Sequence, residues 1–198
     1  MNYSKPILNG LILSGGKSTR MGSDKGLISY HGIPQRQFLY DLAEPLVNKV
    51  FFSIRSEQQV ELASSNSYII DNNEYKGPLN GILSAHKHFP DNAWLVLACD
   101  LPLINQESIQ ELISQRDINK IATAYATKES KLPEPLAAIW EPQGLIKAIA
   151  YMKTAGSSCP RKFLINSDVK LIFPNSDEVL YNANSPEEYQ VAKSKVME

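Results

Sequence analysis

Short apolar runs alternate with amphipathic stretches along the first half of the 198-residue chain. Runs rich in branched or aromatic residues, bounded by glycine or polar residues, predict buried strands. These strands are expected at 7–13, 50–54, 68–70 and 94–98. Between them, apolar residues at helical spacing predict helices at 35–48, 57–64, 80–88 and 106–116, the first of them bent or shortened by Pro45. This alternation predicts a parallel sheet with helices on both faces.

The second half of the chain has a less regular pattern. Strands are expected at 121–126, 135–140 and 169–173, with a polar turn over 127–132. Helices are expected at 144–152, after Ser158 as an N-cap, and after Ser185, which precedes Pro186 in the first turn. The chain has no internal repeat and no convincing linker. We therefore expect one domain over 1–198, an α/β protein with a three-layer α/β/α, Rossmann-like, mostly parallel (mixed) sheet.

Composition narrows the class of protein. Hydrophobic residues make up 43% of the chain and charged residues 21%, as in an ordinary soluble globular protein. A formal net charge of −1 gives no global basic field, so nucleic acid is not an expected partner. The two cysteines, Cys99 and Cys159, form no CxxC pattern, which favours a reducing compartment and no zinc site. With no signal peptide or membrane-spanning run in view, we expect a cytoplasmic protein without a membrane partner.

The stretch after the first predicted strand carries the clearest candidate chemistry. The apolar run stops at Ser14-Gly15-Gly16, where small residues let backbone N–H groups approach a ligand closely. Three cations and one acid follow, which are Lys17, Arg20, Asp24 and Lys25. The spacing fits neither a P-loop nor a GxGxxG fingerprint. This stretch is therefore a candidate phosphate-binding loop of another kind.

Two acids follow other predicted strands of the same sheet. Asp71 comes after the third strand and Asp100 directly after the fourth. In open parallel sheets ligands bind outside the carboxyl ends of the strands. We therefore expect both carboxylates to lie beside the cationic loop.

The motifs resemble those of the molybdenum cofactor guanylyltransferases, within the wider nucleotidyltransferase superfamily. The loop reads S-G-G-x-S-x-R-M-G-x-D-K from Ser14 to Lys25, and the later segments are similar to the family's GPLxG, C-D-x-P, EPL and N-x-N-T-P-E-E. These later segments are Gly77-Pro78-Leu79-x-Gly81, Cys99-Asp100-Leu101-Pro102, Glu134-Pro135-Leu136 and Asn182 to Glu188. The matches keep the family's order from residue 7 to about 190. Ser14 replaces a usual Ala, and Arg55 stands where the family commonly has an Asn near the base or ribose.

The resemblance implies transfer of GMP from GTP to the phosphate of molybdopterin or molybdenum cofactor, with release of pyrophosphate. Lys25 would contact the α-phosphate, Arg20 the departing phosphates, and Asp100 a Mg²⁺ cofactor. The nucleotide-binding residues would be Leu13, Ser14, Gly15, Gly16, Lys25, Asp71, Gly77, Pro78, Leu79, Gly81 and Asp100. Asn182 and Asn184 would bind the acceptor. Residues to about 116 would form the nucleotide-binding half, and about 117–198 the acceptor-binding half.

Base choice is expected to favour GTP over CTP. The guanylyl branch resembles x-G-G in the loop and the cytidylyl branch A-A-G, and here the loop has Ser14-Gly15-Gly16. The second glycine, Gly16, would admit the larger purine. Asp71 would accept hydrogen bonds from guanine N1–H and the 2-amino group, a donor pair that adenine and cytosine lack.

Two alternatives stay open at this point. The chain could be a CTP-using molybdopterin cytidylyltransferase or a sugar-phosphate nucleotidyltransferase, although it is short for the latter. From another class, it could be a non-catalytic carrier that hands the cofactor to an apoenzyme. The resemblance also suggests molybdoenzyme apoproteins or their chaperones as candidate partners.

Several other reactive or aromatic residues are given structural interpretations. His86 and His88 are two apart on a helix and cannot chelate together, so a surface helix end is expected. His31 is expected to be solvated, and Cys99 to serve packing. Trp94 and Trp140 are expected to lie in the core. Arg161 and Lys162 are expected to lie on a plain, solvated helix face.

Overall fold

The computed structural model describes residues 5–16, 24–62 and 66–197, with only the backbone of Ala155. Within these residues the chain forms one seven-stranded sheet in the order β3-β2-β1-β4-β6-β5-β7. All neighbouring strands pair in parallel except β6, which runs antiparallel to β4 and β5. The strands are β1 (Leu8–Leu13), β2 (Val50–Ile54), β3 (Tyr68–Ile70), β4 (Ala93–Ala98), β5 (Ala122–Ala126), β6 (Pro133–Trp140) and β7 (Val169–Ile172). The predicted α/β fold with a mostly parallel, mixed sheet is confirmed.

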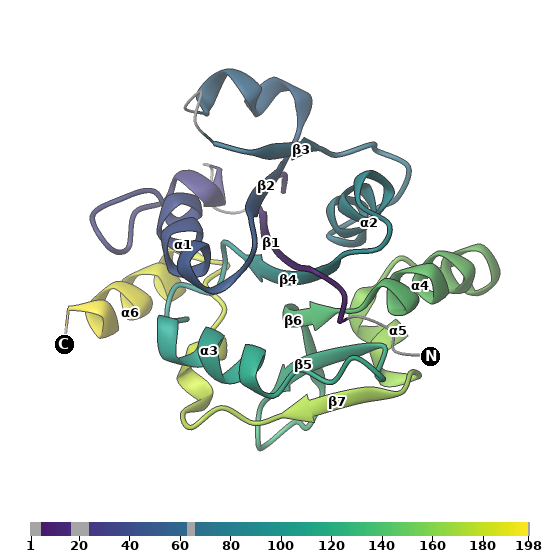
Figure 1. Ribbon diagram of the computed structural model, residues 1–198. Coiled ribbons are helices and arrows are strands. Elements are labelled where there is room, and N and C mark those ends of the chain that lie inside the picture. Colours follow the sequence, from purple (N-terminus) through teal and green to yellow (C-terminus); the bar gives the residue numbers. More distant parts are fainter. Residues whose placement is uncertain (1–4, 17–23, 63–65, 198) are drawn as a thin grey trace.

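Helices cover both faces of this sheet (Figure 1). On one face lie α1 (Gln35–Ala43) and α3 (Gln106–Ser114), and on the other α2 (Leu79–His88), α4 (Pro142–Ala155) and α5 (Pro160–Ile165). The last helix, α6 (Pro186–Val196), packs beside Tyr30 at one end of the molecule. None of the described helices is both long and apolar enough to cross a bilayer.

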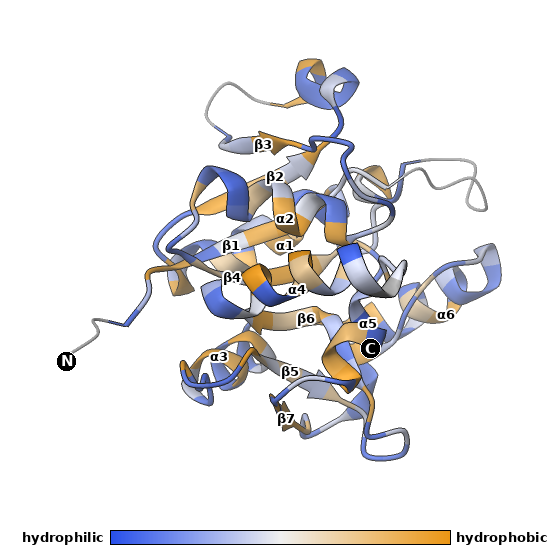
Figure 2. Cartoon of the chain, turned by 90° about the vertical axis from the view of Figure 1, so that its right-hand side faces the viewer, coloured by the Kyte–Doolittle hydropathy of each residue, from blue (hydrophilic) through white to orange (hydrophobic). Residues whose placement is uncertain are grey.

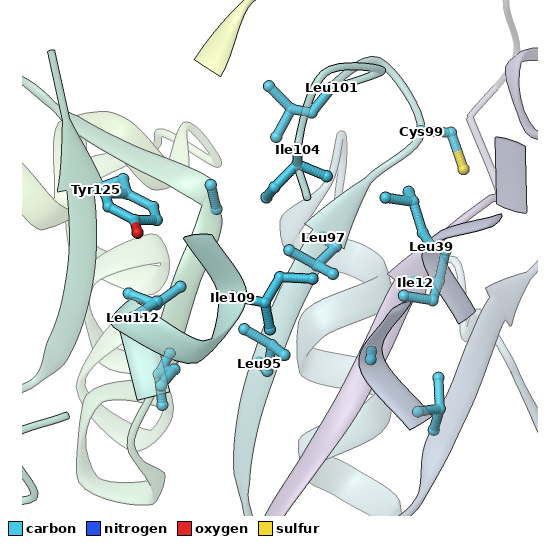
Figure 3. Close-up of a cluster of buried hydrophobic side chains, with 14 of the residues drawn as sticks. Ile12, Leu39, Leu95, Leu97, Cys99, Leu101, Ile104, Ile109, Leu112 and Tyr125 are labelled. Carbon is cyan, nitrogen blue, oxygen red and sulfur yellow. The ribbon is translucent and has the colours of Figure 1, made fainter. Parts of the chain in front are cut away.

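Side-chain alternation along β4 divides the core into two clusters. Leu95 and Leu97 point to the α1 and α3 face, whereas Trp94 and Val96 point to the α2 and α4 face. Successive strand residues face opposite sides of a sheet, so a central strand covered on both sides is apolar throughout. Figure 3 shows the first cluster, where Leu39 of α1 and Ile109 of α3 lie against the sheet. Figure 2 shows the hydrophobic residues gathered along the central strands.

Two predicted helices differ from expectation, and a third is shortened as expected. The helix predicted over 35–48 ends at Ala43 and gives way to a 3-10 turn, Glu44–Leu46, because Pro45 cannot donate a helical hydrogen bond. Within the segment predicted as a helix over 57–64, the structure has a 3-10 helix, η3 (Ser56–Glu61), and residues 63 and 64 lie outside the described residues. Helix α5 begins at Pro160 without a side-chain cap, so the prediction that Ser158 caps it is wrong.

The predicted cap of the last helix is confirmed. Ser185 Oγ accepts a hydrogen bond from the Glu188 N–H at 3.2 Å, and the Glu188 carboxylate accepts from the Ser185 N–H at 3.0 Å. The same carboxylate accepts from the Asn184 N–H at 2.6 Å. This capping box therefore also fixes the backbone of Asn184.

The antiparallel direction of β6 explains how the second half of the chain reaches the edge of the sheet formed by the carboxyl ends of β1 to β4. Leu97 pairs with Ala137, so the start of β6 lies beside the carboxyl end of β4. Glu134 and Leu136, at the beginning of their strand, therefore lie at the same edge as Asp100, at the end of its strand.

Candidate nucleotide-binding site

A cleft of about 460 Å³ opens at the carboxyl edge of β1, β2, β3 and β4. Strand β1 lies between β2 and β4, so the connection from β1 to β2 and the connection from β3 to β4 lead to strands on opposite sides of β1. Open α/β sheets bind ligands at such a reversal of strand order. The volume is within the range of small-molecule sites. Residues predicted to bind nucleotide that line the cleft are Leu13, Ser14, Gly15, Gly16, Lys25, Asp71, Gly77, Pro78, Gly81 and Asp100.

Leu79 is the described member of the predicted nucleotide set that does not line the cleft. Its side chain is fully buried and packs in the α2 face of the core. It anchors the first turn of α2, whereas its neighbours Pro78 and Gly81 face the cleft. Arg20 lies outside the described residues.

Asp71 stands at one end of the cleft with its carboxylate held by β2. Its Oδ1 accepts a hydrogen bond from the Ser53 hydroxyl at 2.7 Å, and its backbone N–H donates to the Ile54 carbonyl at 2.8 Å. Burial raises the pKa of Asp71, while the Ser53 hydroxyl and the Arg55 charge act in the opposite direction. A half-buried carboxylate with one oxygen anchored can present the other to a donor pair on a ligand.

Gly15 is the loop residue that lies against this carboxylate. A Cβ on Gly15 would lie 2.6 Å from Asp71 Oδ2, closer than side-chain atoms can approach. A Cβ on Gly16 would meet nothing within 4 Å. Gly15 is therefore the glycine whose missing side chain leaves room for the Asp71 carboxylate, and the role of Gly16 in admitting a purine stays a prediction.

Helix α2 holds the segment between Asp71 and the cleft-lining Gly77. The Asn80 side-chain oxygen accepts from the Tyr75 N–H at 3.1 Å, and Ser84 Oγ accepts from the Asn72 N–H at 2.9 Å. Asn80 also lines the cleft. The sequence motif names Gly77 and Gly81 but gives no signal for Asn80, because its role depends on where the preceding segment folds back.

At the other end of the cleft, three residues far apart in the chain meet. Lys25 Nζ lies 3.4 Å from Asp100 Oδ2 and donates to the side-chain oxygen of Asn184. The Asp100 carbonyl accepts from the Ala183 N–H at 2.9 Å, which ties the end of β4 to the segment before α6. A cation, a carboxylate and an amide are thus brought together, as the sequence predicted for Lys25 and Asp100.

The donor set at this end fits Mg²⁺ bound largely through a substrate. Asp100 Oδ1 is buried and has no hydrogen-bond partner among the described residues. The described parts of the chain contain no group of three or more His, Cys, Asp or Glu side chains that could hold a metal. Mg²⁺ commonly takes one or two protein oxygens and completes its octahedron with phosphates and water. Asp100 and the neighbouring Asn184 oxygen can supply those protein ligands.

The other predicted acceptor residue, Asn182, has a different environment. Its side-chain amide donates to the Leu180 carbonyl at 3.1 Å, and it does not line the cleft. Asn184 therefore reaches the Lys25 and Asp100 cluster, whereas Asn182 holds the backbone before it.

Arg55 and Gln58, which follow β2, contact the loop in a way that sequence reasoning missed. Arg55 Nη1 donates to the Gly15 carbonyl at 2.7 Å. Arg55, which replaces the Asn of the family motif, therefore binds the loop backbone. Gln58 Nε2 donates to the Ser14 carbonyl at 3.0 Å and to the Asp24 carboxylate. A glutamine in a short polar helix is indistinguishable in sequence from a solvated one.

Glu134 lies behind the Asp100 end of the cleft. Burial raises the pKa of Glu134, the Arg161 guanidinium opposes this, and the Asp100 charge adds to the rise. Arg161 donates to the Glu134 carboxylate, and its Nε donates to the Pro133 carbonyl at 3.2 Å. The expectation of a plain helix face is thus wrong for Arg161, which joins α5 to the start of β6.

Two histidine predictions are also corrected. His86 was expected on a surface helix end, but it is buried and lines a small cavity together with Ile149 of α4, and burial lowers its pKa. His31 was expected to be solvated, but its ring stacks on the Phe38 ring with the two centroids 3.6 Å apart. Its Nε2 also forms a hydrogen bond with the Pro102 carbonyl at 2.8 Å. His88 is exposed, as expected.

The remaining packing predictions are confirmed. Trp94 and Trp140 are fully buried. Cys99 is also buried, and this burial raises the pKa of its thiol, so it is a poor nucleophile despite lying next to Asp100.

A cleft at this place in the sheet, lined by Ser14-Gly15-Gly16, Lys25 and Asp100, has the arrangement expected of a nucleotidyltransferase. Comparison with known families agrees, since the MobA-like NTP transferase domain matches residues 10–170. The chain therefore belongs to the MobA-like NTP transferase domain family.

Individual relatives carry related descriptions. The molybdenum cofactor biosynthesis bifunctional protein of Synechocystis is 38% identical over 189 residues, 95% of this chain and 54% of that protein. The chain thus spans about half the length of that relative. The molybdenum cofactor guanylyltransferase of Pseudomonas fluorescens is 29% identical over 189 residues, 94% of each chain. The fold is shared with molybdopterin-guanine dinucleotide biosynthesis protein A of Archaeoglobus fulgidus, with a TM-score of 0.77, 21% identity, and coverage of 96% and 98%.

Proposed function

We propose that the protein transfers GMP from GTP to the terminal phosphate of molybdopterin or molybdenum cofactor and releases pyrophosphate. One observation carries the proposal. A single cleft has an anchored carboxylate, Asp71, at one end and the Lys25, Asp100 and Asn184 cluster at the other. The first end suits a guanine edge and the second a phosphate chain, so one bound GTP can use both.

At the base end, Asp71 accepts the N1–H and 2-amino hydrogens of guanine. Ser53 keeps the carboxylate turned toward the ligand, and Gly15 leaves room beside it. Because cytosine and adenine lack this donor pair, the same carboxylate disfavours CTP and ATP.

At the phosphate end, the chain's own groups position the triphosphate and offset charge. Lys25 shifts from Asp100 toward the α-phosphate, where negative charge develops as the acceptor phosphate attacks in line. Asp100 and Asn184 would hold Mg²⁺, which when bound supplies Lewis-acid stabilisation of the phosphate oxygens. Arg20 is proposed to contact the departing β- and γ-phosphates.

The acceptor is proposed to enter from the side formed by the second half of the chain. Asn184, fixed by the α6 capping box, lies at the boundary between the phosphate cluster and that side. The product would then pass to a molybdoenzyme apoprotein or its chaperone. We place the reaction in the cytoplasm, where reducing conditions keep Cys99 and Cys159 as thiols.

A pyrophosphate-release assay with Mg²⁺, molybdopterin and either GTP or CTP tests the proposal. We expect release with GTP, a much slower reaction with CTP, and loss of activity when Mg²⁺ is chelated. Asp100→Asn should lower kcat by at least a hundredfold, whereas the matched exposed variant Asp91→Asn should retain activity. Pyrophosphate release with CTP but not with GTP would refute the proposed guanylyltransferase activity. Absence of release with both triphosphates would also refute it.

A further inference from the structure

We propose that Gln58 is a positioning residue of this site, which fixes the nucleotide loop at Ser14 and Asp24 and thereby sets the position of Lys25. This inference rests on the proposed function, in which Lys25 contacts the α-phosphate. Gln58 comes from the 3-10 helix after β2 and touches neither Lys25 nor the open cleft. Its effect on the reaction would therefore be transmitted through the loop.

Both the amide nitrogen and the amide oxygen of Gln58 have hydrogen-bond partners in this region. Its Nε2 donates to the Ser14 carbonyl at 3.0 Å and to Asp24 Oδ2, and its Oε1 accepts from the Arg55 N–H at 2.8 Å. The side chain is 1% exposed, so water cannot replace these partners. Only a carboxamide combines two donors with an acceptor in one uncharged planar group.

Asp24 passes this constraint to Lys25. Its other oxygen, Oδ1, accepts from the Gly26 N–H at 2.9 Å and caps the single 3-10 turn Lys25–Leu27. The orientation of Asp24 thus determines where that turn begins, and Lys25 is the first residue of the turn. From there its Nζ reaches Asp100 and Asn184. The chain of contacts runs from Gln58 through Asp24 to the lysine at the phosphate cluster.

Arg55 reinforces the same arrangement with a second bridge. Its Nη1 donates to the Gly15 carbonyl at 2.7 Å, and its Nη2 lies 3.8 Å from Asp24 Oδ2. Both bridges therefore connect the backbone at the end of β1 to the carboxylate of Asp24. The base contact beside Gly15 and the phosphate contact at Lys25 are held in a fixed relation by side chains from one segment.

Gln58→Glu is the sharpest test because it preserves size and shape but removes both donors at neutral pH. The introduced buried carboxylate would repel the Asp24 carboxylate. Because Asp24 caps the turn that begins at Lys25, Lys25 should be displaced. We expect kcat for pyrophosphate release to fall about ten- to a hundredfold at pH 8, with a smaller change in the KM for GTP. Burial and the Asp24 charge should raise the pKa of the introduced acid, so its protonated form should restore part of kcat as the pH is lowered.

The matched control is Gln59→Glu, which makes the same charge change at the next, exposed residue of the same 3-10 helix. It should keep wild-type kcat and show no recovery at low pH. Gln58→Met, which keeps the packing without the hydrogen bonds, should also lower kcat while leaving the thermal midpoint within a few degrees of wild type.

The outcomes separate this inference from the proposed function. Full kcat in folded Gln58→Glu or Gln58→Met, equal losses in both Gln58→Glu and the Gln59 control, or unfolding of both Gln58 variants would overturn the positioning role. Absence of turnover in the wild-type protein would instead refute the proposed function. GTP binding measured by calorimetry in Mg²⁺ provides the second readout, and we expect it to weaken less than kcat falls.

Discussion

Gly15→Ala should remove the preference for guanine while leaving the fold intact. The new Cβ would lie 2.6 Å from Asp71 Oδ2. A carbon and an oxygen rarely approach more closely than about 3.3 Å, so the carboxylate must move by about 0.7 Å. The atom that has to move is the end of a side chain, so the thermal midpoint should change little. The carboxylate is, however, the group proposed to read the base.

The expected loss can be estimated from the hydrogen bonds involved. Recognition tolerates displacements of about 0.5 Å, and hydrogen bonds to charged groups each contribute about 1.5–3 kcal/mol. If one of the two bonds to guanine is lost, or both are weakened, GTP binding should lose about 2–3 kcal/mol. At about 1.4 kcal/mol per tenfold change, the Kd for GTP should rise about 30- to 150-fold. The Kd for CTP should stay within about twofold because CTP does not use these bonds.

Calorimetric titration of GTP and CTP into the wild type, Gly15→Ala and Gly16→Ala measures this effect directly. Gly16 is the matched control, since its Cβ would meet nothing within 4 Å and its backbone is outside the left-handed region. Gly16→Ala should keep the wild-type ratio of the Kd values for CTP and GTP, because its Cβ does not displace Asp71. An equal or larger loss of that ratio in Gly16→Ala, or an unchanged ratio in Gly15→Ala, would contradict the structural reasoning and favour the sequence-based role of Gly16 in admitting the purine.

Three further predictions concern stability and reactivity. Because burial raises the pKa of Asp71, Asp71→Asn should increase the free energy of unfolding at neutral pH. In denaturant titrations, this gain should shrink as the pH falls through the raised pKa and vanish below the usual pKa range of a carboxyl group. Arg116 and Glu141 form a buried bidentate pair at 2.6 and 2.9 Å, so Arg116→Met should cost about 3–5 kcal/mol of stability, and adding Glu141→Leu should restore part of it. With Cys99 buried and Cys159 exposed, a thiol reagent should modify one cysteine in the native protein and both in denaturant; two rapid native reactions would contradict the buried position of Cys99.

The sequence predicts the parts of this structure that depend on local pattern. Apolar runs such as 94–98 are long enough and sufficiently bounded to identify strands, and the strand-end rule then places Asp71 and Asp100 at one edge. Ser185 is identified as a cap because the capping residue and Glu188 are neighbours in sequence. Each of these inferences needs only residues close together in the chain or a general rule of sheet topology.

Residues whose environment is set by distant segments escape such reasoning. His86 has the sequence context of a helix end, yet it is buried and shares a small cavity with Ile149 of α4, which is distant in the chain. Gln58 is polar in a polar segment, and its contacts to Ser14 and Asp24 arise because β2 lies next to β1. Arg55 was the weakest match to the family motif because it replaces an Asn, and nothing in the sequence indicates what it contacts instead. Its partner is the Gly15 backbone, whose position relative to β2 no local pattern encodes.

Asp100 connects the stability of the site to its chemistry. Lys25 engages Oδ2, while the buried Oδ1 has no partner among the described residues, an arrangement that costs about 1–3 kcal/mol. The aspartate cannot easily turn away, because its backbone is held at the end of β4 and by the Ala183 N–H. In the proposed reaction, a cation that reaches Oδ1 would recover this cost, so the energy given up in folding would contribute to binding where phosphate charge develops. Asp71 differs because its Oδ1 already accepts a hydrogen bond from Ser53, and this agrees with the base-selecting role that we propose for it.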